Sequence, residues 1–345
     1  MTQAFDPSAP AAPESGLFGL NTAFEDAAVQ ILGVPIDATT SFRRGTAGGP
    51  AAILAASHQI DLFDPLTGHP YRQGIHMPSL EAGLIELNRL AGQLALPVIQ
   101  AGGAGDSKQL LAAINKVDRA QEGVNHWVDA QVRAGLEAGQ LVGLVGGDHS
   151  VPLASIVAHA ERHPDMGILH FDAHADLRVA YEGFEYSHAS IMHNVLSGAP
   201  GVSKLLQVGL RDLCEEEYQA IEASNGRVEA IFDHEWASLR MQGADLQQFV
   251  RESIAKLPQE VYISFDIDGL DPSLCPSTGT PVPGGLLWPE AMLWLEELAR
   301  SGRRIVGFDL CEVSPTPGQP AGHGWDEIVG ARLLYRLIGF ALMTR

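Results

Sequence analysis

The sequence predicts an α/β protein with a parallel sheet of about eight strands that helices cover on both faces. Two observations predict this fold class. Short apolar runs without strict alternation of apolar and polar residues recur along the chain, as in strands buried on both faces. Longer segments with helical spacing separate these runs.

The strands and helices are expected to alternate along the chain. The candidate strands are residues 29–35, 96–102, 140–146, 167–171, 204–210, 228–232, 260–265 and 303–308. The candidate helices include residues 106–138, 150–162, 213–224, 244–257, 289–301 and 325–342. Polar motifs directly follow four of the strands. Because ligands bind outside the carboxyl ends of strands in open α/β sheets, we expect these motifs to meet at one edge.

The domain organisation is expected to be simple. Residues 1–16 are rich in Pro, Ala and Ser and are predicted to form a disordered N-terminal arm. No Pro/Gly-rich linker divides the rest, so residues 17–345 are predicted to form a single domain.

Composition and charge narrow the possible functions. The formal net charge of −20 disfavours nucleic acid and anionic membranes as partners and is compatible with a small cationic substrate. No apolar run approaches the roughly 20 residues of a membrane span, and the N-terminus lacks the pattern of a secretory signal. The three cysteines show no CxxC spacing, which fits a reducing compartment and a cytoplasmic location.

The stretch FDAHADL, residues 171–177, places ionisable side chains on alternate residues at the end of a buried strand. Asp172, His174 and Asp176 share one face because strand side chains alternate. Such a stretch alone is either a solvated turn or one wall of a cation site, since buried like charges are costly without a counter-ion.

Two further strand ends carry the same kinds of ligand. GGDHS supplies His149, and DIDGLDP supplies Asp266 and Asp268. Together with FDAHADL they offer four carboxylates and two imidazoles, and two divalent cations would neutralise the four carboxylates. Water between two such ions can lose its proton near neutral pH and become a nucleophile. Mixed oxygen and nitrogen ligands favour a first-row ion such as Mn²⁺, Ni²⁺, Co²⁺ or Fe²⁺.

These motifs resemble those of the ureohydrolases, the family of arginase and agmatinase. GGDHS, FDAHADL, SFDIDGLDP, PSTGTPVPGG and CEVSP occur in the family's order, and residues 33–53 resemble its first-strand loop. The resemblance extends from about residue 30 to the C-terminus. It implies a three-layer α/β/α arginase-like fold, hydrolysis of a guanidino carbon at a two-metal site, commonly with release of urea, and a homotrimer or homohexamer.

The resemblance also implies a division of the ligands and further site residues. His149 and Asp176 would hold one Mn²⁺ or Ni²⁺ ion, His174 and Asp268 the other, and Asp172 and Asp266 would bridge them. His188 in YSHAS corresponds to a proton-shuttling histidine, and histidine suits protonation of a leaving amine at neutral pH. Glu312 in CEVSP corresponds to a carboxylate that pairs with the guanidinium. Thr280 in STGTP is a further polar contact on the same rim. The remaining histidines, His170 among them, are assigned to the surface or to the core.

Two departures from arginase sequences narrow the range of possible substrates. Arg178 stands where arginases place an Asn, and Cys214 where they place a second Asp, so L-arginine loses partners for its amino-acid end. The loops 37–42, 60–68 and 182–194 resemble a bacterial branch that includes guanidine hydrolases, some of which use nickel. The leading hypothesis is therefore guanidine or another compact guanidine compound, converted to urea plus ammonia or an amine. Agmatine or another guanidinoalkyl compound, such as 4-guanidinobutyrate, is the alternative.

Two other classes of protein compete with this hypothesis. A non-catalytic partner subunit would be expected to have lost ligands, but all six are present. A mononuclear deacetylase on a related fold would need fewer carboxylates and would leave Asp266, Asp268 and His149 together unexplained.

Overall fold

The computed structural model describes residues 6–12 and 14–345. Residues 1–5 and 13 of the predicted arm lie outside the described residues. At the end of that segment Ser15 is buried, and the backbone N–H of Phe18 donates a 2.8 Å hydrogen bond to Oγ of Ser57.

The centre of the molecule is an eight-stranded sheet whose neighbouring strands are all parallel. The strands are β1 (Val29–Val34), β2 (Ile75–His76), β3 (Leu141–Gly146), β4 (Met166–Phe171), β5 (Val202–Leu210), β6 (Val228–Phe232), β7 (Glu260–Asp266) and β8 (Arg304–Cys311). Their spatial order is β2-β1-β3-β8-β7-β4-β5-β6. β1, β3 and β4 are buried along their whole length, as expected for strands covered on both faces.

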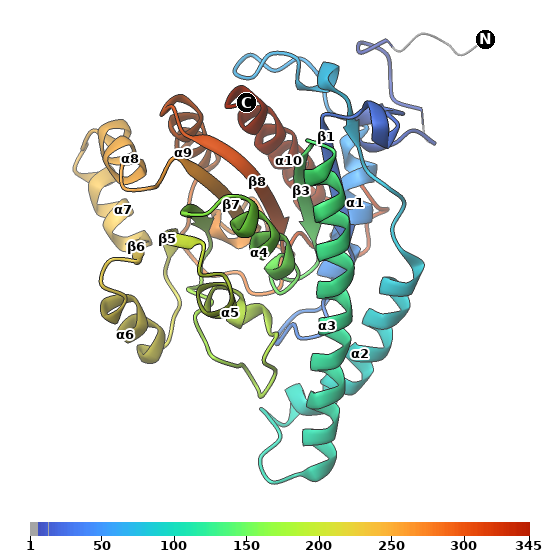
Figure 1. The fold of residues 1–345 in the computed structure, drawn as a ribbon, viewed down its shortest axis with the longest axis vertical. Helices are drawn as coiled ribbons and strands as arrows, with labels where there is room; N and C mark the ends of the chain where they lie inside the picture. The colour runs from blue at the N-terminus through green and yellow to red at the C-terminus, as the bar shows by residue number, and fades with distance from the viewer. Residues whose placement is uncertain (1–5, 13) are drawn as a thin grey trace.

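Helices cover both faces of the sheet and complete the three-layer α/β/α fold (Figure 1). The helices are α1 (Gly49–Ser57), α2 (Ala82–Gln100), α3 (Lys108–Glu137), α4 (Leu153–Arg162), α5 (Ile191–Gly198), α6 (Glu215–Ala223), α7 (Asp233–Met241), α8 (Leu246–Ile254), α9 (Trp288–Arg300) and α10 (Trp325–Met343). One apolar core joins α1, α7, α8, α9 and α10 to the sheet, and smaller clusters join α2 to α6 to it. The long helices α2 and α3 extend past the sheet as a hairpin (Figure 1).

The strand predicted at residues 96–102 is wrong, because this segment is the end of α2 and the turn that follows it. The buried residues of α2 recur at helical spacing, and the helix packs against α3. They include Leu84, Asn88, Ala91, Ala95 and Val98. Pro97 lies inside the helix. The eighth strand is instead β2, a two-residue strand at the edge of the sheet.

The strand order positions the candidate site. β3, β8, β7 and β4 are consecutive neighbours in the middle of the sheet. Each of their carboxyl ends leads directly into one of the four polar motifs. The chain passes from β3 to β4 across two positions that β8 and β7 fill later. Such a break in the sequential strand order is a topological switch point, where ligands bind in α/β sheets.

Candidate active site

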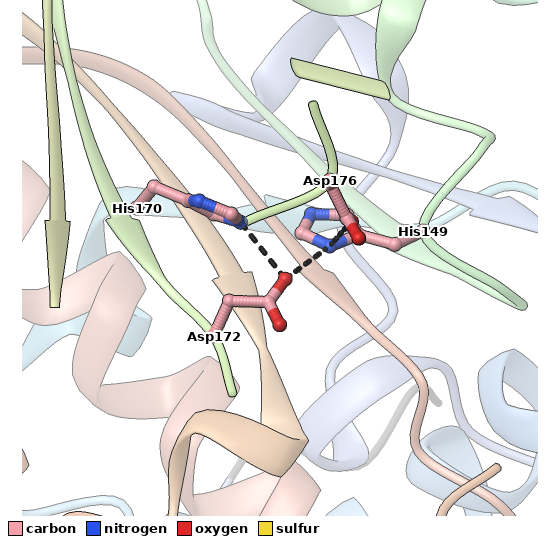
Figure 2. A group of neighbouring side chains, drawn as sticks. All are labelled: His149, His170, Asp172 and Asp176. Atoms are coloured by element: carbon pink, nitrogen blue, oxygen red, sulfur yellow. Dashed lines mark hydrogen bonds and ion pairs between the residues drawn. The ribbon is translucent and has the colours of Figure 1, made fainter. Parts of the chain in front are cut away.

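The six predicted metal ligands lie together at the carboxyl ends of the central strands. His149 lies three residues after β3, and Asp172 directly follows β4. Asp266 is the last residue of β7, and Asp268 lies in the short 3₁₀ turn Ile267–Gly269 that follows it. Figure 2 shows that His149 and Asp176 approach Asp172 from one side and His170 from the other.

One group of ligands is centred on Nδ1 of His149. This atom lies 3.1 Å from Oδ2 of Asp172, 3.5 Å from Oδ2 of Asp176 and 3.4 Å from Oδ2 of Asp266. All four side chains are buried. Three carboxylate oxygens and one imidazole nitrogen therefore face one small volume, a donor set that fits a divalent first-row cation.

A second group is centred on His174. Its Nδ1 lies 3.3 Å from Oδ1 of Asp172 and 3.1 Å from Oδ2 of Asp268. The two oxygens of Asp172 thus face two different imidazoles, Oδ2 toward His149 and Oδ1 toward His174. This is the geometry that a carboxylate between two cations requires.

Local backbone hydrogen bonds fix the carboxylates in place. Oδ1 of Asp172 accepts from the backbone N–H of His174 at 2.6 Å, and Oδ1 of Asp266 accepts from that of Asp268 at 2.8 Å. Oδ1 of Asp268 accepts from the backbone N–H of Ala173 at 3.0 Å and so joins the β7 loop to the β4 loop. The alternating acidic residues therefore form turns that aim their remaining oxygens at the imidazoles.

The charges of the site are unbalanced without cations. Burial acts to lower the pKa of His149 and of His174, but their carboxylate neighbours outweigh it and raise both pKa values well above the usual range. Burial acts to raise the pKa of Asp172, yet the imidazoles hold that pKa well below its usual range. Burial and neighbouring carboxylates raise the pKa values of Asp176 and Asp266 well above the usual range, and the nearby imidazole of His149 only partly opposes this effect.

His170 lies in the core with both ring nitrogens hydrogen-bonded, as one of the two roles expected from the sequence, but it also contacts a predicted metal ligand. It lies in β4 two residues before Asp172, and its Nε2 is 2.9 Å from Oδ2 of that carboxylate. The same spacing of two that groups Asp172, His174 and Asp176 would have included His170 if extended backward. Burial, its largest influence, lowers the pKa of His170, so the ring is neutral at pH 7.

A buried polar chain behind His149 was also not predicted. Nε2 of His149 lies 2.9 Å from Oγ of Ser264, whose hydroxyl donates to Oδ1 of Asp309 at 3.1 Å. Ser264 precedes Asp266 by two residues and so shares its face of β7. These groups hold the imidazole in an orientation that leaves Nδ1 facing the carboxylates.

Glu312 and Thr280 both lie at the predicted rim. Oε1 of Glu312 accepts a 3.0 Å hydrogen bond from the backbone N–H of His149, and its Oε2 is buried with no hydrogen-bond partner among the described residues. Burial and the charge of Asp266 raise the pKa of Glu312 well above its usual range. Thr280 donates to Oδ2 of Asp268 at 3.3 Å, so it contacts a ligand carboxylate.

A cavity of about 320 Å³ opens beside the ligands. His188 lines it together with His174, Asp176 and Thr280, and Nε2 of His188 lies 3.3 Å from Oγ of Ser41. Burial, reinforced by nearby His174, lowers the pKa of His188 to about 4. The ring is therefore a neutral imidazole at pH 7.

Of the two residues that distinguish this sequence from arginases, Arg178 lines the cavity and Cys214 lies next to the lining residue Leu213. Nε of Arg178 lies 3.6 Å from Oε2 of Glu217, and its guanidinium stacks over the ring of Tyr181 at 4.9 Å. Cys214 precedes α6, and its backbone N–H donates to Oε2 of Glu217 at 2.9 Å. Asp212 also lines the cavity, and its carboxylate forms no hydrogen bond or ion pair with another side chain among the described residues.

The comparisons with known proteins identify the family. A sequence model of the arginase family matches residues 27–339. The chain belongs to the arginase family. It is accordingly a metal-dependent hydrolase of the ureohydrolase type, acting on guanidino C–N bonds.

Arginase-family proteins from several bacteria are similar to this chain over nearly its whole length. The N(1)-aminopropylagmatine ureohydrolase of Thermus thermophilus is 34% identical over 321 residues, which cover 92% of each chain. The agmatinase of Bacillus subtilis is 30% identical over 299 residues, which cover 85% of each. These alignments confirm the resemblance drawn from the five motifs.

Solved structures confirm the arginase-like fold. Proclavaminate amidinohydrolase from Streptomyces clavuligerus superposes with a TM-score of 0.71 at 25% identity, covering 98% of this chain and 100% of that one. The agmatine ureohydrolase of Thermoplasma volcanium has the same fold, with a TM-score of 0.68 at 23% identity and coverage of 94% and 92%. Among the described residues, no helix is both long and apolar enough to cross a membrane.

Proposed function

We propose that this arginase-family hydrolase cleaves the guanidino group of a guanidinoalkyl amine of the agmatine class. Water would add its oxygen to the guanidino carbon. The bond between that carbon and the nitrogen that carries the alkyl chain would break, and urea and a protonated amine would leave. The observation that carries this proposal is the unpartnered carboxylate of Asp212 in the wall of the cavity beside the metal ligands.

The charge pattern of the cavity supports a substrate with a cationic group at each end. Arg178 is paired with Glu217, so it offers no free positive charge to a carboxylate on a substrate. Asp212 is left with an unneutralised charge and is placed to attract an ammonium group. The relatives named agmatinase and N(1)-aminopropylagmatine ureohydrolase are consistent with this substrate class.

The donor set supports a centre of two divalent cations. His149, Asp172, Asp176 and Asp266 would hold one ion, and Asp172, His174 and Asp268 the other, with Asp172 shared. When bound, two such ions neutralise the four carboxylates and make a water molecule acidic enough to act as a nucleophile at neutral pH. Asp266 would also be shared if its second oxygen turned from the backbone N–H of Asp268.

Two side chains would handle the substrate itself. Glu312 would bind and orient the guanidinium through its free Oε2, which is buried and has no other partner among the described residues. His188 would receive a proton and return it to the nitrogen of the leaving amine, as a neutral imidazole can. Thr280 would contact the substrate only if it exchanged its present bond to Asp268.

Free guanidine is the competing substrate, favoured by the sequences of the loops around residues 37–42 and 182–194. Guanidine has a single cationic group, so it would pair with Glu312 and would not contact the carboxylate of Asp212. L-Arginine is disfavoured because its α-carboxylate would be repelled by Asp212, while Arg178 is paired with Glu217 and offers that carboxylate no free positive charge.

A substrate panel tests the proposal. Urea release is measured from agmatine, guanidine, 4-guanidinobutyrate and L-arginine, each with protein loaded with Mn²⁺ or with Ni²⁺. We expect the highest kcat/KM with agmatine. Faster turnover of guanidine or of 4-guanidinobutyrate would overturn the substrate class, and the same panel identifies the metal. Absence of bound transition metal in elemental analysis would instead indicate a non-catalytic subunit, and one ion per chain a mononuclear site.

We also propose a cytoplasmic homo-oligomer, a trimer or a hexamer, without nucleic acid or membrane partners. The acidic composition supports the absence of nucleic acid and membrane partners, the free cysteines support the cytoplasmic location, and membership of the arginase family supports the oligomer. Light scattering of the purified protein tests the oligomeric state.

A further inference from the structure

A buried glutamine on the neighbouring strand contacts the unexpected His170. Gln207 lies in β5, directly opposite His170 in the register of β4 and β5, and both side chains are fully buried. Its Nε2 lies 2.8 Å from the backbone carbonyl of Ala175 and 2.9 Å from Nδ1 of His170.

These contacts fix the orientation of the Gln207 amide. A backbone carbonyl can only accept a hydrogen bond, so the amide must turn its NH₂ group toward Ala175. The second N–H of the same group then points at Nδ1 of His170. Oε1 of Gln207 is left buried without a partner among the described residues, so both polar contacts of this side chain use its donors.

The orientation of Gln207 determines the tautomer of His170. Because Nδ1 accepts a hydrogen bond, it carries no proton, and the proton of the neutral ring lies on Nε2. Nε2 then donates the 2.9 Å hydrogen bond to Oδ2 of Asp172. A nitrogen that carries a proton has no lone pair for a metal ion.

We infer that His170 and Gln207 are positioning residues, which hold the shared carboxylate of Asp172 so that each of its oxygens presents a free lone pair to one half of the metal centre. Oδ2 receives the proton of His170, and Oδ1 receives the backbone N–H of His174 at 2.6 Å. With both oxygens held from behind, the carboxylate cannot rotate out of the plane that joins the two groups of ligands.

The alternative is that His170 itself is a metal ligand. His149, His170, Asp172 and Asp176 could hold an ion by the closeness of their ligand atoms alone. The hydrogen bond from Gln207 argues against this role, since a liganding Nε2 would need its proton on Nδ1, against the N–H of the glutamine.

Metal affinity measured by chelator competition tests the inference in the full-length protein. We expect His170→Phe and Gln207→Leu to weaken Mn²⁺ binding by about 10- to 100-fold, the usual effect of removing a group that orients a ligand. His170→Gln places an amide N–H near the position of Nε2 and should restore binding to within a few-fold of wild type. Gln30→Leu, a change to another buried glutamine at the start of β1, is the matched control and should leave affinity unchanged.

X-ray absorption of the metal-loaded His170→Gln protein separates the two roles. A positioning role predicts the same number of imidazole nitrogens per metal ion as in wild type. A loss of one imidazole from the metal shell would overturn the inference, as would full metal affinity in both His170→Phe and Gln207→Leu. Full metal affinity in Gln207→Leu alone would show that Gln207 does not position His170, and would overturn the inference that this glutamine fixes the proton of His170 on Nε2. These readouts do not depend on the substrate, so they stand or fall separately from the proposed activity.

Discussion

The backbone N–H of His149 donates a 3.0 Å hydrogen bond to Oε1 of Glu312. This contact joins the loop after β3 to the loop after β8, so the carboxylate that we propose to bind substrate is anchored to the peptide that carries a proposed metal ligand. The contact leaves Oε2 of Glu312 as the only oxygen of this side chain without a partner among the described residues.

Glu312→Gln should separate substrate binding from the anchoring contact. The amide oxygen can still accept from the N–H of His149, but the negative charge that pairs with a guanidinium is lost. Loss of a charge-assisted hydrogen bond costs about 1.5–3 kcal/mol, so we expect kcat/KM to fall by about 100-fold with full metal content. Steady-state kinetics and elemental analysis measure the two quantities. Unchanged kinetics would show that Glu312 does not bind substrate.

Asp212→Asn should change substrate preference and leave the chemistry intact. An ammonium group in the cavity would lose its carboxylate partner, and because Asp212 is exposed to solvent we expect KM for agmatine to rise only by about three- to tenfold. KM for guanidine should stay the same, since guanidine has no second cationic group. Glu216→Gln, an exposed carboxylate that does not line the cavity, is the control. An equal effect on both substrates would contradict an ammonium site at Asp212.

His174→Ala should remove one of the two metal ions. His174 contacts the oxygens of Asp172 and Asp268, whereas the contacts around His149 remain. We expect elemental analysis to find one tightly bound ion per chain in place of two, with activity reduced by at least about 100-fold because the shared site is incomplete. His193→Ala in α5 changes a histidine outside the ligand groups and should retain both ions. Two tightly bound ions in His174→Ala would exclude this histidine as a ligand.

The raised pKa of Asp118 on α3 predicts that the stability of the fold depends on pH. Its Oδ1 accepts backbone hydrogen bonds from Glu185 and Tyr186 at 3.2 and 3.5 Å, in the segment that leads to His188. Burial, opposed in part by these hydrogen bonds, raises the pKa of Asp118 to about 6. An acid with a higher pKa in the folded than in the unfolded chain stabilises the fold at low pH, and this contribution is lost as the pH rises through about 6.

Asp118→Asn keeps an oxygen for both backbone hydrogen bonds and removes the charge. We expect the variant to melt at a higher temperature than wild type at pH 8, with the difference vanishing below about pH 4. The carboxylate is only half-buried, so the gain in free energy of unfolding should be less than about 1 kcal/mol. Thermal melts across this pH range measure it, with the exposed Asp106→Asn as control. A gain that is constant with pH would exclude titration of Asp118 as the cause.

The clustering of the six proposed ligands was predictable because its sequence signal is local. Residues two apart at a strand end must share a face, and parallel strands end at one edge, so pattern alone brought them together. His170 obeyed the same rule and was overlooked because it lies inside the strand. Gln207 could not have been found this way, since its role depends on β5 lying beside β4 in a particular register.

The error at residues 96–102 has a different physical cause. The apolar run with the β-branched residues Val98 and Ile99 fits a buried strand locally, although Pro97 disfavours one. The preceding 14 residues of α2 supply a helical face that packs on α3. Tertiary packing outweighed the local preference. The strand β2 was missed because two residues are too short to leave a pattern.

The position of β8 has a consequence for biosynthesis. This strand is the last in the chain, yet it lies between β3 and β7 and pairs with both. A growing chain on the ribosome therefore cannot close the middle of the sheet until residues 304–311 have emerged. Until then the carboxyl edge of the sheet, where the acidic loops after β4 and β7 lie, is incomplete. Pairing between strands that are far apart in the sequence is also slow. We expect metal uptake to follow release of the finished chain, so nascent fragments that end before β8 should bind no stable metal pair.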